Sequence, residues 1–196
     1  MFQADCPLMI TPNPQYCLCL YPSEGAVKMA SYRALPSELV KLGLLGEAFE
    51  FGAETRYKLG ERFYQLLSFM GCAPALKLEP EKDGDIHFCH FRFAEQEQAV
   101  FRYLREESRA RCPHCRKPSD TVAQVEPLFN KANWACPLCQ QVSSIDAINW
   151  KHEAGVSQFF IELIDVHPHE VVPTDGLLKE LQNISGSSWD YFYTTM

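Results

Sequence analysis

Two pairs of cysteines constrain this chain more than any other feature of its sequence. Cys112 and Cys115 are separated by two residues, and Cys136 and Cys139 repeat the same spacing further along the chain. A Cys-x-x-Cys turn places two sulfur atoms on one side of a tight loop, so two such turns supply four ligands for a tetrahedral metal ion. The spacing therefore predicts a closed, structural four-cysteine metal site.

The region around these cysteines, residues 110–151, resembles a zinc ribbon, and the resemblance covers only this part of the chain. Strand-like side chains follow each pair, at residues 121–125 and 142–145. The resemblance implies that the four cysteines together bind one structural Zn²⁺. Zinc ribbons usually have glycine after the second cysteine of each pair, whereas this chain has Arg116 and Gln140. We call residues 110–151 the ribbon.

Three other uses of the cysteines stay open. A rubredoxin-like iron site takes the same four thiolates, although the missing glycines and the short loop argue against it. Dithiol redox centres usually place Cys-x-x-Cys at a helix N-terminus, which neither pair here does. Disulfides are the third use, but the cysteines are nine, an odd number, and the first ten residues lack the basic segment of a signal peptide. We therefore expect a reducing, cytoplasmic location.

Composition limits the classes of protein to which the chain could belong. Its 196 residues suit one domain with an insertion or two small domains, and a hydrophobic share of 46% is enough to form a core. No apolar run approaches the ~20 residues that cross a bilayer, so we expect a soluble protein without a membrane partner. A formal net charge of −7 argues against general nucleic-acid binding.

Apolar periodicity outside the ribbon predicts an α+β core. Residues 49–55 and 85–93 alternate like strands and flank a helical pattern over residues 58–70. The order of strand, helix and strand returns near the end of the chain, at residues 157–165, 175–184 and 189–193. We therefore predict a ferredoxin-like sandwich of two βαβ halves, in which two helices cover one face of a sheet.

These patterns divide the chain into four parts. The two halves of the sandwich occupy residues 47–109 and 157–196, and the ribbon is inserted between them. Residues 1–46 are expected to form an N-terminal extension packed on the core. A further helix, predicted over residues 95–109, would lead from the first half into the ribbon.

Six basic residues surround the first cysteine pair, and only Glu106 and Glu107 oppose them in the same stretch. They are Arg102, Arg105, Arg109, Arg111, Arg116 and Lys117. One interpretation is that they offset the net negative charge of a tetrathiolate zinc centre. The other is a patch that binds the phosphates of a nucleic acid or an acidic partner protein.

Four histidines form a second candidate site, His87, His90, His167 and His169. The segments that carry them are predicted to be antiparallel neighbours, which would bring His87 close to His167. His167 and His169 could bind a catalytic metal, with Glu170 as a base. The simpler interpretation is an exposed turn at residues 167–170, with His87 in the core of the sheet or at its rim.

The sequence favours a zinc-containing binding or adaptor protein whose partner is another protein. A nucleic-acid-binding protein that uses the ribbon and the basic residues 102–117 is the first alternative. A metal-dependent enzyme with the histidine-rich second site is the other.

Overall fold

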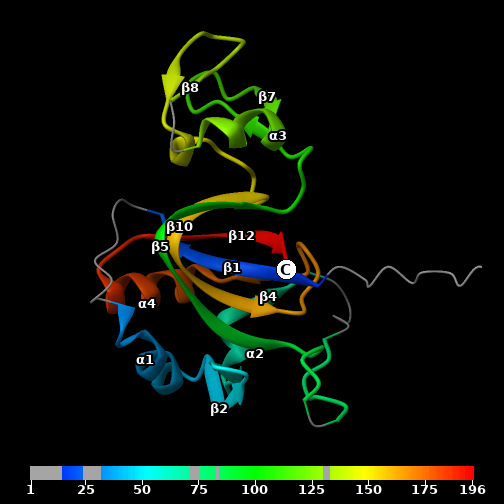
Figure 1. Ribbon diagram of the computed structural model, residues 1–196. Helices are drawn as coiled ribbons and strands as arrows, with labels where there is room; N and C mark the ends of the chain where they lie inside the picture. Colours follow the sequence, from blue (N-terminus) through cyan, green and yellow to red (C-terminus); the bar gives the residue numbers. More distant parts are fainter. Residues whose placement is uncertain (1–14, 24–31, 71–75, 83, 130–132) are drawn as a thin grey trace, which may run out of the picture.

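The computed structural model describes residues 15–23, 32–70, 76–82, 84–129 and 133–196. Its main element is a six-stranded sheet with the strand order β12-β1-β10-β5-β3-β2 (Figure 1). Every neighbouring pair in this sheet is antiparallel. The six strands are β1 (Tyr16–Pro22), β2 (Leu45–Phe51), β3 (Glu54–Leu59), β5 (His90–Tyr103), β10 (Ala154–Ile164) and β12 (Trp189–Thr195).

The smaller elements surround this sheet or build the ribbon. Near the sheet lie α1 (Leu35–Leu42), α2 (Phe63–Leu66), α4 (Asp175–Ser185) and a two-stranded sheet of β4 (Leu67–Phe69) and β11 (Val171–Pro173). The ribbon contains β6 (Arg109–Arg111), β7 (Pro118–Thr121), α3 (Val122–Val125), η2 (Glu126–Leu128), β8 (Trp134–Ala135), β9 (Val142–Ser143) and η3 (Ile145–Ala147). Within the described residues, no helix has the length and apolar character that a bilayer crossing requires.

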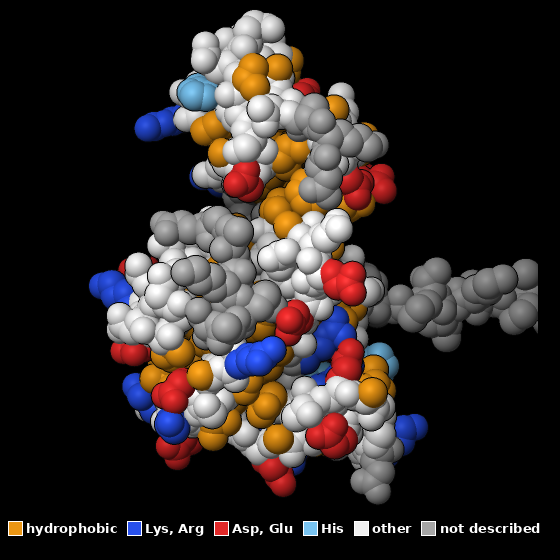
Figure 2. Space-filling view, turned by 60° about the vertical axis from the view of Figure 1, so that its left-hand side comes forward, with side chains coloured by type: hydrophobic (Ala, Val, Ile, Leu, Met, Phe, Trp, Pro, Cys, Tyr) orange, Lys and Arg blue, Asp and Glu red, His pale blue; other side chains and the backbone are white. Residues whose placement is uncertain are grey.

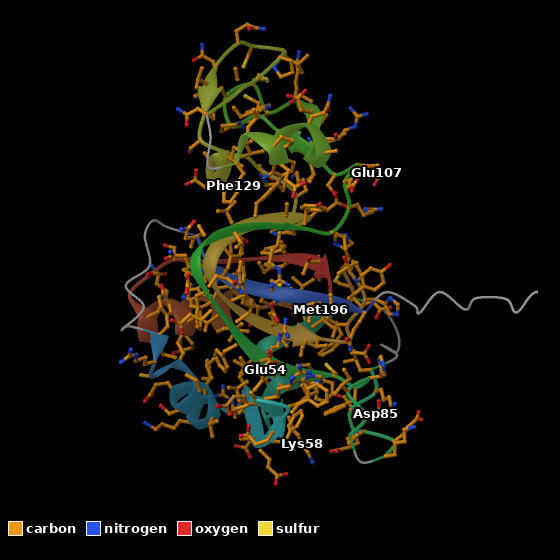
Figure 3. All side chains as sticks on the ribbon, in the orientation of Figure 1. Glu54, Lys58, Asp85, Glu107, Phe129 and Met196 are labelled. Carbon is orange, nitrogen blue, oxygen red and sulfur yellow. The ribbon has the colours of Figure 1, made fainter. Side chains whose placement is uncertain are left out.

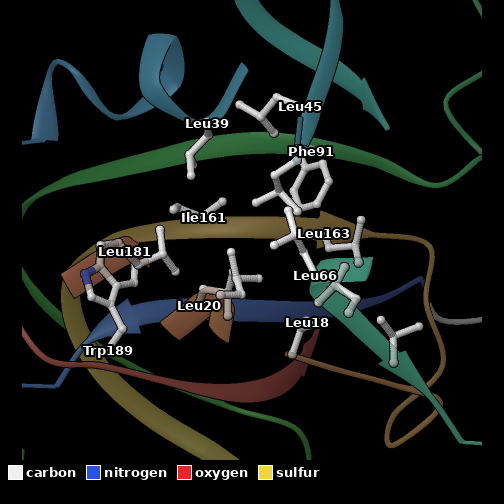
Figure 4. Packing of buried hydrophobic residues seen from close by; sticks show 14 of the residues in the cluster. Leu18, Leu20, Leu39, Leu45, Leu66, Phe91, Ile161, Leu163, Leu181 and Trp189 are labelled. Carbon is white, nitrogen blue, oxygen red and sulfur yellow. The ribbon is translucent and has the colours of Figure 1, made fainter. Parts of the chain in front are cut away.

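Helices α1 and α4 pack against one face of the sheet and enclose the main core. Helix α4 begins where the Thr174 side chain accepts a hydrogen bond from the backbone N–H of Leu177, and it ends at Gly186 with a φ of 76°. Its buried leucines meet side chains of β1, β5 and β10 in one hydrophobic cluster (Figure 4). The cluster includes Leu18, Leu20, Leu39, Phe91, Ile161, Leu163, Leu177 and Leu181.

The sheet curls toward its other face. Its edge strand β12 therefore comes close to the C-terminal end of β5 and the N-terminal end of β10. A register shift between Ser157 and Phe159 bends β10, and Figure 1 shows β5 and β10 arching together above β12. Thr194 of β12 donates to the backbone carbonyl of Tyr103 at 2.8 Å, and the backbone N–H of Tyr193 donates to the carbonyl of His152 at 2.9 Å. These bonds hold the curled sheet closed at one side.

The structure confirms a mixed α+β chain with a mostly antiparallel sheet and few helices, but it corrects several predicted elements. Residues 54–59 are strand β3, so the helix predicted over residues 58–70 is reduced to α2. The helix predicted over residues 95–109 is wrong, because most of this stretch lies in β5. Its apolar side chains fit a helical period, but pairing with β10 outweighs that local preference.

The N-terminal segment also has a different place from the one we predicted. Strand β1 lies between β12 and β10 and pairs with both. Residues 1–46 are therefore not simply an extension packed on the core, because part of this segment supplies an interior strand. Short strands of this kind are difficult to place from sequence, since their partners lie far along the chain.

Candidate metal centre

The four cysteines of the ribbon converge in space. Their sulfur atoms all lie within 4.8 Å of one another. Cys112 Sγ is 3.6 Å from Cys139 Sγ, and Cys115 Sγ is 3.9 Å from Cys136 Sγ. Sulfur ligands at ~2.3 Å from a tetrahedral metal ion would be separated by ~3.8 Å. Among the described residues, this is the one group of three or more Cys, His, Asp or Glu side chains that could hold a metal ion.

The two cysteine loops have the same backbone hydrogen bonds. In the first loop, Arg116 N–H donates to the Cys112 carbonyl at 2.9 Å, and Cys112 N–H donates to the Lys117 carbonyl at 3.3 Å. In the second, Gln140 N–H donates to the Cys136 carbonyl and Cys136 N–H to the Gln141 carbonyl, both at 2.9 Å. Each loop therefore presents its two sulfur atoms in the same way.

Arg116 and Gln140 occupy the positions at which zinc ribbons usually have glycine. Their φ angles are 60° and 62°, in the left-handed region that glycine adopts most easily. The backbone therefore keeps the glycine conformation in both loops without the glycine. The sequence departs from the common pattern here, but the geometry of the loops does not.

Two short hairpins and a small core hold the loops in place. Strands β6 and β7 flank the first loop, and β8 and β9 flank the second. The Trp134 indole N–H donates to Asp120 Oδ2 at 2.8 Å, which joins the two hairpins. Behind the sulfur atoms lies a cluster of buried residues, among them Ala110, Val122, Val125, Trp134, Ile145, Ile148 and Trp150.

The environment of the sulfur atoms is uneven. Burial raises the pKa of Cys112, but the backbone N–H groups of Cys115 and His114 donate to its sulfur and outweigh burial, so the pKa falls to about 6. At Cys139 the N–H of Gln141 lowers the pKa, whereas burial and the neighbouring thiols raise it to about 11. The hydrogen bonds around the two sulfur atoms therefore shift their pKa values in opposite directions.

The six basic residues do not lie on one helix. Arg102 is on β5, where its guanidinium binds the buried carboxylate of Glu162, and Arg105 binds Glu153. Arg109 reaches the carbonyl of Ser119 at 3.5 Å. On the ribbon, Arg111 is partly buried, whereas Arg116 and Lys117 are exposed. The two most N-terminal arginines are thus engaged by carboxylates of this chain.

The four histidines are also distributed over different environments. As predicted, β5 and β10 are antiparallel neighbours, with His90 opposite Ile164. However, His90 is fully buried, with Nε2 3.0 Å from Arg56 Nη1 and Nδ1 2.8 Å from the Phe88 carbonyl. The simpler interpretation was wrong about His87, which is not in the sheet but exposed on the loop before β5. The described residues of this region form no metal-binding group.

His167 and His169 share a cavity of about 410 Å³ with Glu170 and Arg105. The ring of His167 lies 5.5 Å from that of Tyr16, and the ring of His169 lies 4.8 Å from that of Tyr193. The structure thus keeps two of the four histidines together on the exposed turn that the simpler interpretation predicted.

Sequence reasoning missed a polar network on the curled face of the sheet. Glu162 is fully buried, and both of its oxygens accept from arginines, one from Arg92 and one from Arg102. Glu54 bridges Arg92 to Arg56, whose other Nη atom meets His90. The available signal was a single charge inside an apolar strand, as at Glu162 between Ile161 and Leu163.

The ribbon is joined to the sheet by aromatic side chains. Phe129, at the base of the ribbon in Figure 3, has its ring 5.8 Å from that of Phe101 on β5. The ring of Trp150 lies 5.4 Å from the same phenylalanine. Figure 2 shows hydrophobic side chains at this junction. The candidate metal centre is therefore attached to the sheet through a shared apolar contact.

Four converging thiols could hold a metal ion, and the geometry of the two loops is the basis for assigning the site. Comparison with known proteins adds no family to this description. No family model, no curated protein sequence and no solved structure matches the chain.

Proposed function

We propose that this chain is a cytoplasmic binding or adaptor protein in which a structural zinc ribbon is attached to an α+β core. We propose that its partner is another protein. The convergence of four sulfur atoms from two matching loops carries the proposal. Four protein ligands complete a tetrahedron and leave no open position for substrate or water, which is the arrangement of structural rather than catalytic zinc sites. The metal would be retained for the stability of the ribbon.

The distances between the sulfur atoms support a metal over disulfides. The shorter contact, between Cys112 and Cys139, is 3.6 Å, whereas a disulfide bond measures ~2.05 Å. Both contacts join a cysteine of one loop to a cysteine of the other. A single ion at the centre would satisfy both loops, and zinc is the metal that such closed four-cysteine sites usually hold.

We further propose a ferredoxin-like arrangement for the core. The strand order β12-β1-β10-β5 supports it, because the first strand then lies between the third and the fourth of a strand–helix–strand–strand–helix–strand unit. In this arrangement β1 and α1 take the places that sequence analysis gave to residues 49–55 and 58–70. The β2–β3 hairpin extends the sheet beyond β5, and the ribbon is an insertion between β5 and β10.

Exposed side chains on the ribbon favour a protein partner. Leu138 and Val142, beside the last cysteine of the site, are 56% and 59% exposed. Exposed apolar side chains next to a rigid centre suit a protein contact. A nucleic acid is the less favoured partner, because Arg102 and Arg105 are already paired with Glu162 and Glu153. An enzyme is less favoured still, since the histidines form no metal-binding group in the described chain.

Metal analysis of the purified protein tests the proposal. We expect one zinc per chain in the wild type and none in the Cys112→Ser, Cys139→Ser double variant, because two ligands cannot complete the site. His114→Ala is the matched control. This residue lies in the first loop, is exposed and is not a ligand, so its variant should keep the zinc.

Three results would contradict the proposal. Stoichiometric zinc in the double variant would show that other residues bind the metal. Iron with its visible absorption would identify a rubredoxin-like centre. Metal-free wild-type protein with four fewer titratable thiols than its sequence contains would indicate disulfides.

A further inference from the structure

The two cysteine loops, residues 112–118 and 136–142, expose the same positions to solvent. In each loop the first cysteine is buried, the second is partly buried, and the other five residues are exposed. The loops lie against each other, since sulfur atoms of one loop meet those of the other at 3.6 and 3.9 Å. Together they form one surface around the candidate metal centre, at the end of the ribbon that is remote from the sheet (Figure 1). We call it the loop surface.

The side chains of the two loops differ in kind, although the backbones match. The first loop has Arg116 and Lys117 where the second has two glutamines, and neither loop contains Asp or Glu. The second loop instead exposes Leu138 and Val142, at 56% and 59%. Figure 2 shows hydrophobic, histidine and Lys or Arg side chains at this end of the ribbon. The loop surface thus has a basic half and an apolar half, in a chain whose formal net charge is −7.

The basic half has no charge partner within the described chain. Neither the guanidinium of Arg116 nor the ammonium of Lys117 forms a hydrogen bond or an ion pair there. By contrast, carboxylates of this chain pair with Arg92, Arg102 and Arg105. The loop surface therefore keeps two cations available for the charges of another molecule.

Arg116 is also held in a backbone conformation that costs free energy. Its φ angle is 60°, and Gln140 at the equivalent position of the second loop has a φ of 62°. The Gln140 side chain is used locally, because it donates to the Pro137 carbonyl at 3.1 Å. The Arg116 side chain makes no such bond. Its own loop therefore gives no reason for an arginine in place of the glycine that zinc ribbons usually have.

The combination of charge and apolar surface selects an acidic protein segment as the occupant. Guanidinium and ammonium groups bind carboxylates and phosphates alike. The phosphates of a nucleic acid would leave Leu138 and Val142 in water, and neither loop has an aromatic side chain on which a base could stack. A protein segment can supply carboxylates and apolar side chains together. The net negative charge of the whole chain would also direct such a segment toward this basic surface.

We propose that the loop surface binds a short acidic segment of the partner protein, in which Asp or Glu side chains flank a large apolar side chain. The inference rests on the proposed function, because it identifies what the binding module recognises. The carboxylates pair with Arg116 and Lys117, and the apolar side chain covers Leu138 and Val142. Zinc-bound loops are already ordered, so binding loses little conformational entropy on this side of the contact.

A library of random twelve-residue peptides displayed on phage tests which class of segment binds. The target is the zinc-loaded full-length protein, and peptides that also bind the Arg116→Gln, Leu138→Ala double variant are removed. We expect the retained peptides to be enriched in Asp and Glu next to Leu, Ile or Phe. Fluorescence anisotropy of a retained peptide then measures its affinity for the wild type and for each single variant.

Replacing Arg116 with the usual glycine separates binding from stability. Arg116→Gly should keep its zinc and unfold at the same temperature or higher, because glycine adopts this φ without strain. It should nevertheless bind the peptide about tenfold more weakly, since a hydrogen bond to a charged group is lost. Gln140→Gly is the matched control, which relieves the same strain in the other loop and should keep its affinity. Loss of zinc from Arg116→Gly would show instead that the arginine offsets the thiolate charge, and would overturn its assigned role.

The apolar half is tested by a separate pair of variants. Leu138→Ala should also weaken binding about tenfold with an unchanged zinc content, because apolar anchors contribute much of the affinity of such contacts. Val40→Ala removes a side chain that is 45% exposed on α1, and it should leave the affinity unchanged.

Several results would overturn the inference. They are recovery of no peptide, retained peptides without an excess of Asp and Glu, and equal affinities of the wild type and the Arg116 and Leu138 variants. Tighter binding of a twelve-nucleotide single-stranded DNA, or of phosphatidylserine vesicles, would identify a nucleic acid or a membrane as the occupant instead. A zinc-containing protein that gives any of these results refutes only this inference, whereas a protein that never contains zinc refutes the proposed function.

Discussion

Glu162 and His90 show how ionisable residues are accommodated inside this sheet. The carboxylate of Glu162 is fully buried, but two guanidinium groups satisfy its oxygens. Breaking such a pair by removing one partner usually costs about 3–5 kcal/mol, since the other charge is left buried. His90 is accommodated differently, as a neutral ring that accepts from Arg56 and donates to the Phe88 carbonyl.

The stability of the protein should depend on pH through His90. Burial lowers the pKa of this residue, the bond to Phe88 acts in the opposite direction, and Arg56 lowers the pKa further. As pH falls below about 6.5, the unfolded chain therefore binds a proton at this histidine before the folded chain does. The contribution of His90 to the free energy of unfolding should be constant above that pH and should decrease below it.

Urea unfolding over a pH series measures this effect. His90→Gln should unfold more easily than the wild type near neutral pH, but its stability should decrease less between about pH 6.5 and 5. His87→Gln is the matched control for the loss of a histidine, because His87 is exposed on the loop before β5. If the His90 variant keeps the full slope of the wild type, another group causes it.

At the level of elements, the sequence was informative where a pattern was long and local. Strand β10, helix α4 and strand β12 lie close to their predicted positions. The convergence of the cysteine loops was also predictable, because each loop is specified by a few adjacent residues. The second half of β5 was not, since its side chains satisfy a helical period and its strand character depends on pairing with β10, about fifty residues further along.

The curled sheet depends on a close approach of β10 to β12 at Gly155. A Cβ atom at this position would lie 2.4 Å from Cδ1 of Phe192. We therefore expect Gly155→Ala to lower the free energy of unfolding by about 1–3 kcal/mol, because an overpacked core has to shift its side chains or backbone. Thermal or urea unfolding measures the loss.

A second substitution makes the cause of that loss testable. Phe192→Leu in the Gly155→Ala background should recover part of the stability, since the smaller side chain gives the new methyl group room. Gly176→Ala in α4 is the control, because the nearest atom to its Cβ, Thr174 Oγ1, is 3.6 Å away. That variant should be at least as stable as the wild type. Equal losses at both glycines would argue against the close contact.

The described part of the molecule has three hydrophobic clusters, one on each face of the sheet and one centred in the ribbon. The ribbon cluster is small, and α1 and α4 cover only the sheet. A unit as small as the ribbon buries too little apolar surface to fold without its metal. The ribbon cluster should therefore respond differently from the two clusters of the sheet when the metal is removed.

Chelation should unfold the ribbon and leave the sheet folded. In hydrogen–deuterium exchange, we expect loss of protection over residues 110–151 after a strong chelator is added, with α4 and β12 still protected. The Cys112→Ser, Cys139→Ser variant should give the same pattern without chelator. Simultaneous loss of protection in the sheet would show that the two units fold as one.

The position of the ribbon between β5 and β10 also has an entropic consequence for the sheet. The last paired residues of these strands, Tyr103 and Ala154, are separated by about 50 residues. An ordered ribbon brings its own ends together at Arg111 and Asn149, so only about 11 residues remain to close the hairpin. Each doubling of loop length costs ~0.6 kcal/mol, so this shortening is worth roughly 1 kcal/mol. A ribbon that is already folded also lowers the effective sequence separation between the contacting residues of β5 and β10. Because these are interior strands, the whole sheet should then assemble faster.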